Sequence, residues 1–339
     1  MNVNGRHSSN GQEQRAHWHY EVYGQFLCSD VRLPELRGAR FKTRDMEFRF
    51  GPNDEANGTS PQSVSPVTRH STNLDCDLLV YDLGSSYLLR WEGKCDFLVT
   101  ADGRYIECRP GPSVGIRWVQ SILYGMMMSY ALHLQGVGTL HASAIETPQG
   151  ACAFLAEPGT GKSTLAARFA SRGHRFFTDD VLALDENEGE FTVQPGFPYT
   201  SLSAVSMEGL FEPGKAPVPS YLNDDKFRVA VDGTWASFAP EPTRLSSLFI
   251  ISRAREPGSD LTVKRLSAVE GTLALMENSL CVHFLPGEAL RRHFGFAARL
   301  AKSVPVWRMQ YPGGFDNADI AIDAVLDTIA APSGGHSNG

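Results

Sequence analysis

Short apolar runs rich in β-branched and aromatic residues dominate the first third of the chain. The runs span residues 19–27, 78–81, 87–91 and 96–99. Turn-forming pairs such as Asp102-Gly103 separate them, which is the pattern of strands joined by tight turns. We therefore predict a β-rich N-terminal module over residues 17–112. Its side chains suggest no particular chemistry.

One long apolar stretch follows at residues 122–134, which contain no Asp, Glu, Lys or Arg. This stretch makes about three and a half helical turns, whereas a membrane span needs about 20 apolar residues. Gln135 and Gly136 end it. We predict a buried core helix and no membrane association.

After this helix, strand-like and helix-like segments alternate. In order, they are residues 140–146, 151–155, 163–172 and 174–179, with a glycine-rich loop before the third. Such alternation is typical of an α/β domain. We place this domain at residues 113–331, with a boundary near residues 109–115. Its last helix is expected at residues 318–330, where Ile322 and Val325 would pack on the sheet.

Composition narrows the class of protein. The 339 residues carry 31 Lys and Arg against 38 Asp and Glu, a net charge of -7, so nucleic acid and anionic membranes are not expected partners. The six cysteines are scattered without metal-ligand spacing, which argues against a zinc or iron-sulfur site. Residues 1–16 and 332–339 read as disordered tails. The first lacks the apolar core of a secretory signal, so we expect a cytoplasmic protein.

A phosphate-loop motif of the form A-x-x-x-x-G-K-S joins the predicted strand at 151–155 to the predicted helix at 163–172. The motif reads Ala156, Glu157, Pro158, Gly159, Thr160, Gly161, Lys162 and Ser163, and Thr164 follows it. Its glycines let successive N–H groups turn toward phosphate oxygens at the positive end of the helix dipole. Lys162 would place its ammonium on the β- and γ-phosphates, and Ser163 would offer a hydroxyl to Mg²⁺. We expect residues 156–164 to bind ATP.

Two adjacent acidic residues, Asp179 and Asp180, end the predicted strand at 174–179. The preceding helix carries the chain about 16 Å away from the loop, and the strand returns about 20 Å. The two carboxylates should therefore lie level with the phosphate loop. Asp179 would hold Mg²⁺ or its water together with Ser163, and Asp180 would accept a proton from a hydroxyl nucleophile. The alternative is an Asp-Asp turn that only ends a strand.

His141 is placed by the same kind of arithmetic. If the turn at residues 147–150 closes an antiparallel hairpin, Glu146 faces Ala151. Five further steps along each strand then set His141 opposite Ala156, the first residue of the phosphate loop. The hairpin favours an active-site role for His141. Without it, a histidine packed in the core would be the simpler interpretation.

These segments resemble a known family. Leu140-His141-Ala142-Ser143, residues 156–163 and residues 172–180 resemble the C-terminal catalytic domain of bacterial HPr serine kinase/phosphorylase in order and spacing. The resemblance is specific over residues 138–184. It implies an α/β P-loop kinase domain of the HPr kinase type, use of ATP and Mg²⁺, and active-site roles for His141, Lys162 and Asp180. Homo-oligomers, which occur among relatives of the HPr enzyme, are a further expectation.

The chain departs from the family at residues 194–202, where the family has a Mg²⁺-binding glutamate and an Arg-Gly-Leu-Gly-like run. An HPr target and phosphorylase activity therefore do not follow. Residues 23–24 and 29–36 resemble shorter HPr-kinase-like proteins, some of which modify ribosomally made peptides on serine. This implies a protein or peptide hydroxyl as the acceptor. Lys226 and Arg228 could supply a cation to the transition state, or could belong to an exposed charged strand.

Three functions remain open at this point. The leading hypothesis is an ATP-dependent kinase that transfers the γ-phosphoryl group to a serine-type hydroxyl. The second is an ATP-binding sensor or scaffold without catalysis, suggested by the missing glutamate segment. The third is an NTPase that drives a conformational change and has no phosphoacceptor.

Overall fold

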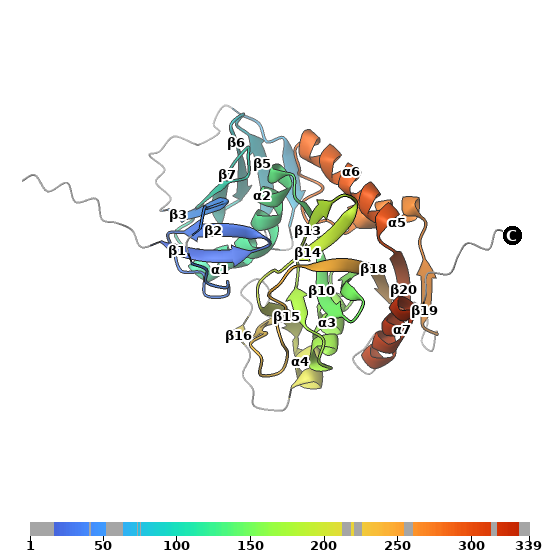
Figure 1. Cartoon of the computed structure of the whole chain (residues 1–339). Coiled ribbons are helices and arrows are strands. Elements are labelled where there is room, and N and C mark those ends of the chain that lie inside the picture. The colour runs from blue at the N-terminus through green and yellow to red at the C-terminus, as the bar shows by residue number, and fades with distance from the viewer. Residues whose placement is uncertain are drawn as a thin grey trace, which may run out of the picture.

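The computed structural model describes residues 17–40, 42–51, 64–72, 74, 76–211, 218–219, 226–253, 260–312 and 317–331. The tails predicted at residues 1–16 and 332–339 lie outside this part of the chain. Figure 1 shows the path of the chain, with the N-terminal strands in blue and cyan and the last helices in orange and red.

The N-terminal strands form one eight-stranded sheet in the order β1-β2-β3-β8-β7-β6-β5-β4, so this part of the chain is rich in strands, as predicted. The strands are β1 Trp18–Val22, β2 Gln25–Ser29, β3 Met46–Phe50, β4 Thr68–Ser71, β5 Asp77–Asp82, β6 Ser86–Trp91, β7 Cys95–Thr100 and β8 Tyr105–Pro110. The run predicted as one strand at residues 19–27 is in fact a hairpin. Tyr23 and Gly24 turn the chain there, both with positive φ, and only Gly adopts that conformation without strain.

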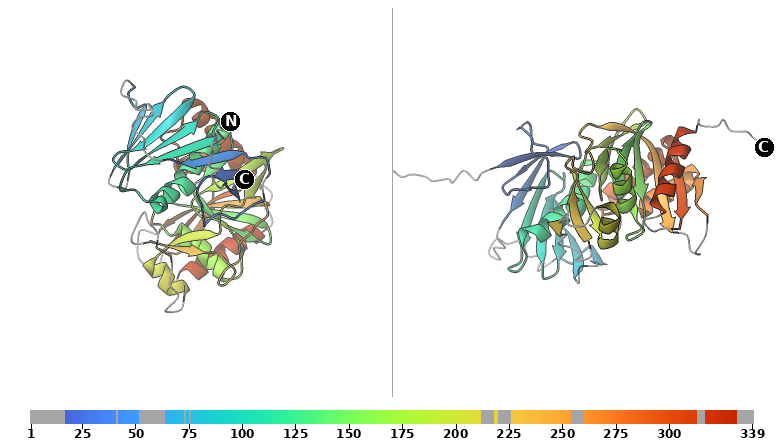
Figure 2. Two further views of the ribbon diagram at one scale, coloured as in Figure 1. Left: turned by 90° about the vertical axis from the view of Figure 1, so that its left-hand side faces the viewer. Right: turned by 90° about the horizontal axis from the view of Figure 1, so that it is seen from below.

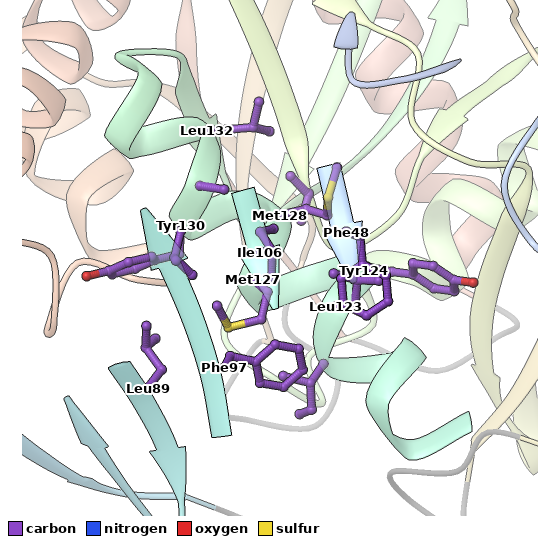
Figure 3. Packing of buried hydrophobic residues seen from close by; sticks show 14 of the residues in the cluster. Phe48, Leu89, Phe97, Ile106, Leu123, Tyr124, Met127, Met128, Tyr130 and Leu132 are labelled. Carbon is purple, nitrogen blue, oxygen red and sulfur yellow. The ribbon is translucent and has the colours of Figure 1, made fainter. Parts of the chain in front are cut away.

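The predicted core helix is present and longer than its apolar stretch. It consists of α1 Ile116–Ile122, a π-helical turn η1 Leu123–Met127 and α2 Met128–Gln135. Its apolar side chains pack against the first sheet: Figure 3 shows Leu123, Met127 and Tyr130 among Phe48, Leu89, Phe97 and Ile106. Burial against a sheet explains the absence of charge from this segment. No helix in the described residues is both long enough and apolar enough to cross a membrane.

A close backbone approach fixes the helix on the sheet. Gly103, in the turn between β7 and β8, has φ +70°, and a Cβ there would lie 2.2 Å from the carbonyl oxygen of Ala131 in α2. The Gln135 side chain donates a hydrogen bond to the Gly103 carbonyl at 2.9 Å. The β7–β8 turn can therefore seat the helix only if residue 103 has no side chain.

We expect Gly103→Ala to lower the free energy of unfolding by about 3 kcal/mol or more, because it adds a backbone clash to the left-handed strain. Gly84→Ala is the matched control: Gly84 has φ +82° in the β5–β6 turn, but nothing lies within 4 Å of the position that a Cβ would take there. It should cost only about 1 to 2 kcal/mol. Chemical denaturation measures both, and equal losses would show that the contact with α2 has no effect.

The second sheet has nine strands, and its largest part runs in the order β12-β10-β11-β18-β20-β19. These strands are β10 Ala142–Thr147, β11 Gly150–Leu155, β12 Phe176–Thr178, β18 Thr243–Arg253, β19 Thr262–Arg265 and β20 Val306–Tyr311. A branch of three strands leaves the start of β18: β14 Glu190–Gln194, β13 Leu182–Asn187 and β9 Gly138–Leu140.

Helices cover both faces of this sheet, which confirms the α/β class. Along β11, Ala151, Ala153 and Leu155 face one core cluster, while Cys152 and Phe154 face another. This is the alternation expected of a strand buried on both sides. The first cluster contains residues of α5 Ala268–Glu277 and α6 Gly287–Ser303, and the second contains residues of α3 Lys162–Ser171 and α7 Ala318–Ala330. Ile322 and Val325 of α7 are buried as predicted.

The strand directions gather several chain segments at one edge of the sheet. β11 is parallel to β18, and β18 is parallel to β20. β10 is antiparallel to both β11 and β12, so β12 also runs parallel to β11. The carboxyl ends of β11, β12, β18 and β20 and the amino end of β10 therefore lie at the same edge, which is where open α/β sheets bind ligands.

A small third sheet lies over this edge. It contains β15 Tyr199–Ser203, β17 Lys226–Ala230 and β16 Val218–Pro219, in that order. Helix α4 Ala204–Leu210 follows β15 directly, and the Ser203 side chain caps it by accepting a hydrogen bond from the Ser206 amide.

The largest core cluster joins residues of the first sheet to residues of the C-terminal half, including Phe197, Cys281, Phe284 and Leu285. In the views of Figure 2 the first sheet lies at one end of the molecule and α7 at the other. The division into domains at residues 109–115 stays a prediction, since one apolar core spans the proposed boundary.

A buried histidine pair joins α2 to α6. The rings of His133 and His293 lie 4.5 Å apart between centroids. Thr139 Oγ1 lies 2.9 Å from His133 Nε2, and Ser279 Oγ lies 2.7 Å from His293 Nε2. Burial lowers the pKa of His293 to about 4, and burial together with His293 and Arg292 lowers the pKa of His133 as well. Both rings are therefore neutral in the folded protein at pH 7.

This pair predicts acid lability. Between about pH 6.5 and pH 4 the unfolded chain binds a proton at residue 293 and the folded chain does not, so the free energy of unfolding falls as the pH falls. From pH 7 to pH 5 we expect His293 alone to remove about 2 kcal/mol. His293→Leu should make this dependence shallower. Denaturation at both pH values checks this, and an unchanged slope in His293→Leu would contradict it.

Candidate functional site

The glycine-rich loop connects the end of β11 to the start of α3, as predicted from the motif. Gly159 and Gly161 have φ +83° and +114°, conformations that favour glycine. No side chain caps the N-terminus of α3, which leaves the backbone N–H groups of its first turn without a side-chain acceptor. Arg253, at the end of β18, donates to the carbonyls of Gly159 at 2.9 Å and Thr160 at 3.3 Å. The loop thus has a defined shape next to a helix N-terminus that suits an anion.

Asp179 is the most heavily hydrogen-bonded side chain of the site. It follows β12, is only 3% exposed, and accepts bonds on both carboxylate oxygens. The donors to Oδ1 are Ser143 Oγ at 2.5 Å, Ser163 Oγ at 2.9 Å, Lys162 Nζ at 3.4 Å and the Asp180 amide at 3.1 Å. The donors to Oδ2 are Thr200 Oγ1 at 2.9 Å and the Ser201 amide at 3.1 Å. A buried carboxylate with this many donors is a structural centre as well as a candidate ligand.

Lys162 points from the start of α3 toward both acids. Its Nζ lies 3.4 Å from Asp179 Oδ1 and 3.8 Å from Asp180 Oδ1, and its side chain is only 8% exposed. It also donates to Ser143 Oγ at 3.3 Å. Because an ammonium is costly to bury without a counter-charge, the two aspartates hold it at the loop.

Asp180 faces the open side of the site. Its backbone has φ +70°, an uncommon conformation for a residue with a side chain, and its side chain is 49% exposed. Desolvation by the surrounding protein would by itself raise the pKa of Asp180. The hydrogen bond from His141 and the charges of Lys162 and Lys226 outweigh this effect and lower the pKa well below the ordinary range. Asp180 is therefore an ionised carboxylate at neutral pH.

His141 lies beside Asp180, with Nε2 3.5 Å from Oδ1. The predicted hairpin register is confirmed: Glu146 pairs with Ala151 and Ala142 pairs with Leu155, so His141 precedes β10 at the loop. Its backbone amide donates to the Asn278 carbonyl at 2.8 Å. Burial, then the charge of Lys162, lowers its pKa below the usual 6.5 despite the opposing effect of Asp180. The ring is neutral at pH 7 and can donate one N–H to the carboxylate.

His141, Lys162, Ser163 and Asp180 line one cavity of about 710 Å³. Its wall includes the loop from Glu157 to Leu165, with His141 and Asp180 on the β10 and β12 side. Arg253 and Tyr311 line it on the β18 and β20 side of the loop. The volume suits a ligand of nucleotide size.

The site's oxygen atoms fit a magnesium ion that arrives with a phosphate ligand. Ser163 Oγ donates its proton to Asp179, which leaves its lone pairs for a cation. Asp180 adds an exposed carboxylate. Mg²⁺ commonly takes one or two protein oxygens plus phosphates and waters, and within the described residues no cluster of three or more His, Cys, Asp or Glu could hold a metal alone. Since both oxygens of Asp179 are engaged, it would act on the ion through the Ser163 hydroxyl.

Comparison with known proteins gives little beyond this geometry. No protein-family model matches the chain, and no curated protein matches it. Among solved structures, the Hpr(Ser) kinase/phosphatase from Coxiella burnetii is similar, with a TM-score of 0.32 and 12% identity over 56% of this chain and 94% of that chain. Because that TM-score and identity are low, we draw no conclusion about this chain from the match.

The structure brings together the predicted His141, Lys162, Ser163, Asp179 and Asp180, and their chemical roles stay predictions. It also adds residues that sequence reasoning missed. These are Ser143, Thr200 and Ser201, which donate to Asp179, and Arg253, which holds the loop carbonyls. Thr200 and Ser201 lie in the segment that departs from the resembling family. Ser143 belongs to the segment Leu140-His141-Ala142-Ser143, and its position two residues after His141, in the strand paired with β11, was the available signal.

The hydrogen bonds to Asp179 predict a large effect of a small change. Asp179→Asn keeps the shape but removes the charge that balances Lys162, and its amide cannot accept all of the donors. We expect a loss of about 3 kcal/mol in the free energy of unfolding. Ser143→Ala removes one donor and should cost about 1 kcal/mol. Urea denaturation compares the two, and an Asp179→Asn protein as stable as Ser143→Ala would contradict the central place of this carboxylate.

Proposed function

We propose that this protein is an ATP-dependent kinase that transfers the γ-phosphoryl group to a serine-type hydroxyl of a protein or peptide. The observation that carries the proposal is the convergence of three groups at one cavity. The Lys162 ammonium, the Ser163 hydroxyl and the exposed Asp180 carboxylate meet beside a glycine-rich loop and a helix N-terminus. Phosphoryl transfer needs this combination of a cation, a metal ligand, backbone donors and a base.

Residues 156–164 would bind the phosphates. The amides of the loop and of the first turn of α3 provide N–H donors, and the macrodipole of α3 favours negative charge at the same point. Lys162 is already held at the loop by the acids and would place its charge on the β- and γ-phosphates. Bound Mg²⁺ would supply further positive charge for the transfer, held by Ser163, whose hydroxyl is in turn hydrogen-bonded to Asp179.

Asp180 would orient the acceptor hydroxyl and receive its proton. Its low pKa makes it a weak base, but in a loose transition state the hydroxyl proton leaves late, so orientation contributes more than basicity. His141, neutral and 3.5 Å away, would hold the Asp180 carboxylate in place through its N–H. The phosphoryl group moves to the hydroxyl oxygen, ADP leaves, and the proton goes to Asp180.

The direct test is transfer of label from γ-labelled ATP to a serine-containing peptide library. We expect transfer by the wild type and a loss of at least about a hundredfold in Asp180→Asn, with ATP binding retained. Asp185→Asn is the matched control, because Asp185 is an exposed aspartate of β13 that does not line the cavity. Transfer at the wild-type rate by Asp180→Asn would overturn the role of Asp180. Phosphate release without any labelled acceptor would favour the NTPase. ATP binding without turnover would favour the ATP-binding sensor.

A further inference from the structure

The small third sheet presents a polar face to the cavity. In its antiparallel register Ser201 pairs with Arg228 and Ser203 pairs with Lys226. Residues two apart on a strand point the same way, and all four of these residues line the cavity that contains Lys162 and Asp180. Two cations of the third sheet therefore line the same cavity as the glycine-rich loop.

The two cations differ in how they are held. Lys226 is exposed and acts on Asp180 through its charge. The Arg228 side chain is only 11% exposed, and its guanidinium donates to Glu35 Oε1 at 3.3 Å and to Ser121 Oγ at 3.0 Å. It also lies 5.8 Å from the ring centroid of Tyr124. Arg228 thus has a fixed position, whereas Lys226 does not.

The groups that fix Arg228 come from the N-terminal part of the chain. Glu35 follows β2, and Ser121 and Tyr124 belong to α1 and η1, which pack on the first sheet. Glu35 is itself held at its second oxygen, because the Tyr124 hydroxyl donates to Oε2 at 2.8 Å. Burial, then the charge of Glu35, raises the pKa of Tyr124, so its hydroxyl keeps the donated proton at neutral pH. Because both oxygens of the Glu35 carboxylate are hydrogen-bonded, Glu35 holds the Arg228 guanidinium in a defined orientation.

Arg228 is close to the acidic pair. Its register partner Ser201 donates its backbone amide to Asp179 Oδ2 at 3.1 Å. Arg228, Asp179 and Asp180 all line one small pocket of about 20 Å³. A guanidinium has five N–H donors, and only two of them are hydrogen-bonded within the described residues. The remaining donors are available to an anion in the cavity that Arg228 and Lys162 both line.

We propose that Arg228 binds the γ-phosphoryl group of ATP and that Glu35 is the positioning residue that orients it. The inference rests on the proposed function and extends it, because it makes the N-terminal sheet part of the site. The charge of a transferring phosphoryl group is spread over its equatorial oxygens, which a planar, fixed fork of donors matches better than a mobile ammonium. Arg228 therefore contacts the γ-phosphoryl group, and the α- and β-phosphates stay with the glycine-rich loop.

The test measures the affinities of the whole chain for ATP and for ADP by titration calorimetry in the presence of Mg²⁺. Arg228→Lys and Glu35→Gln should each weaken ATP binding by about tenfold or more and leave ADP binding within about twofold. Glu21→Gln is the matched control, because it breaks the Glu21–Arg37 ion pair, 2.9 Å long, on the same sheet but outside the cavity. It should change neither affinity. ADP binding also reports that the variants are folded.

Equal weakening of ATP and ADP, or no weakening of either, would overturn the assignment of Arg228. An effect of Arg228→Lys without one of Glu35→Gln would overturn the positioning role of Glu35. The transfer assay separates these outcomes from the proposed function. If the wild type transfers phosphate and the variants keep the wild-type ratio of ATP affinity to ADP affinity, only this inference is refuted. A wild type that binds ATP without transfer, with the ratio lowered in the variants, refutes the kinase activity and retains Arg228 as a γ-phosphate ligand.

Discussion

The site depends on one buried electrostatic constraint: the ammonium of Lys162 and the carboxylate of Asp179 must neutralise each other out of solvent. An isolated charge in either position would be costly, and the pair is stable only because further donors satisfy the remaining lone pairs of Asp179. Those donors come from β10, from α3 and from β15. A single carboxylate therefore ties the glycine-rich loop, the central sheet and the small third sheet into one arrangement.

The same constraint gives the two aspartates different surroundings and different capacities to bind a ligand. Asp179 is saturated by protein donors and has little capacity left for a ligand, whereas Asp180, the next residue, is half exposed and ionised. The left-handed backbone at Asp180 turns its side chain away from the buried cluster and into the cavity. Two adjacent residues of one type thus have distinct surroundings, one suited to holding the site together and the other to meeting a hydroxyl.

The local features of the site could be predicted from sequence, and its long-range features could not. The hairpin register that places His141, the helix after the loop and the return of the chain to Asp179 all follow from short-range spacing, and each is present. Thr200, Ser201 and Glu35 could not be placed in this way, because their positions depend on packing between segments far apart in the chain. The segment around Thr200 has an irregular pattern of apolar and polar residues with two prolines. No local feature of the sequence indicates that β15 contacts Asp179. The hairpin within residues 19–27 was missed because its two-residue turn begins at Tyr23, a residue type that rarely adopts positive φ.

The central claim is that the loop and the buried lysine form a binding site for nucleoside triphosphate. Titration of the protein with ATP in the presence of Mg²⁺, for the wild type and Lys162→Met, tests it most directly. Lys162→Met removes the counter-charge of Asp179, which keeps its hydroxyl and amide donors, so the two proteins are compared under conditions in which denaturation shows both to be folded. We predict saturable binding by the wild type and a loss of affinity of about a hundredfold or more in Lys162→Met. Equal affinities for the two proteins, or no binding by the wild type, would contradict it.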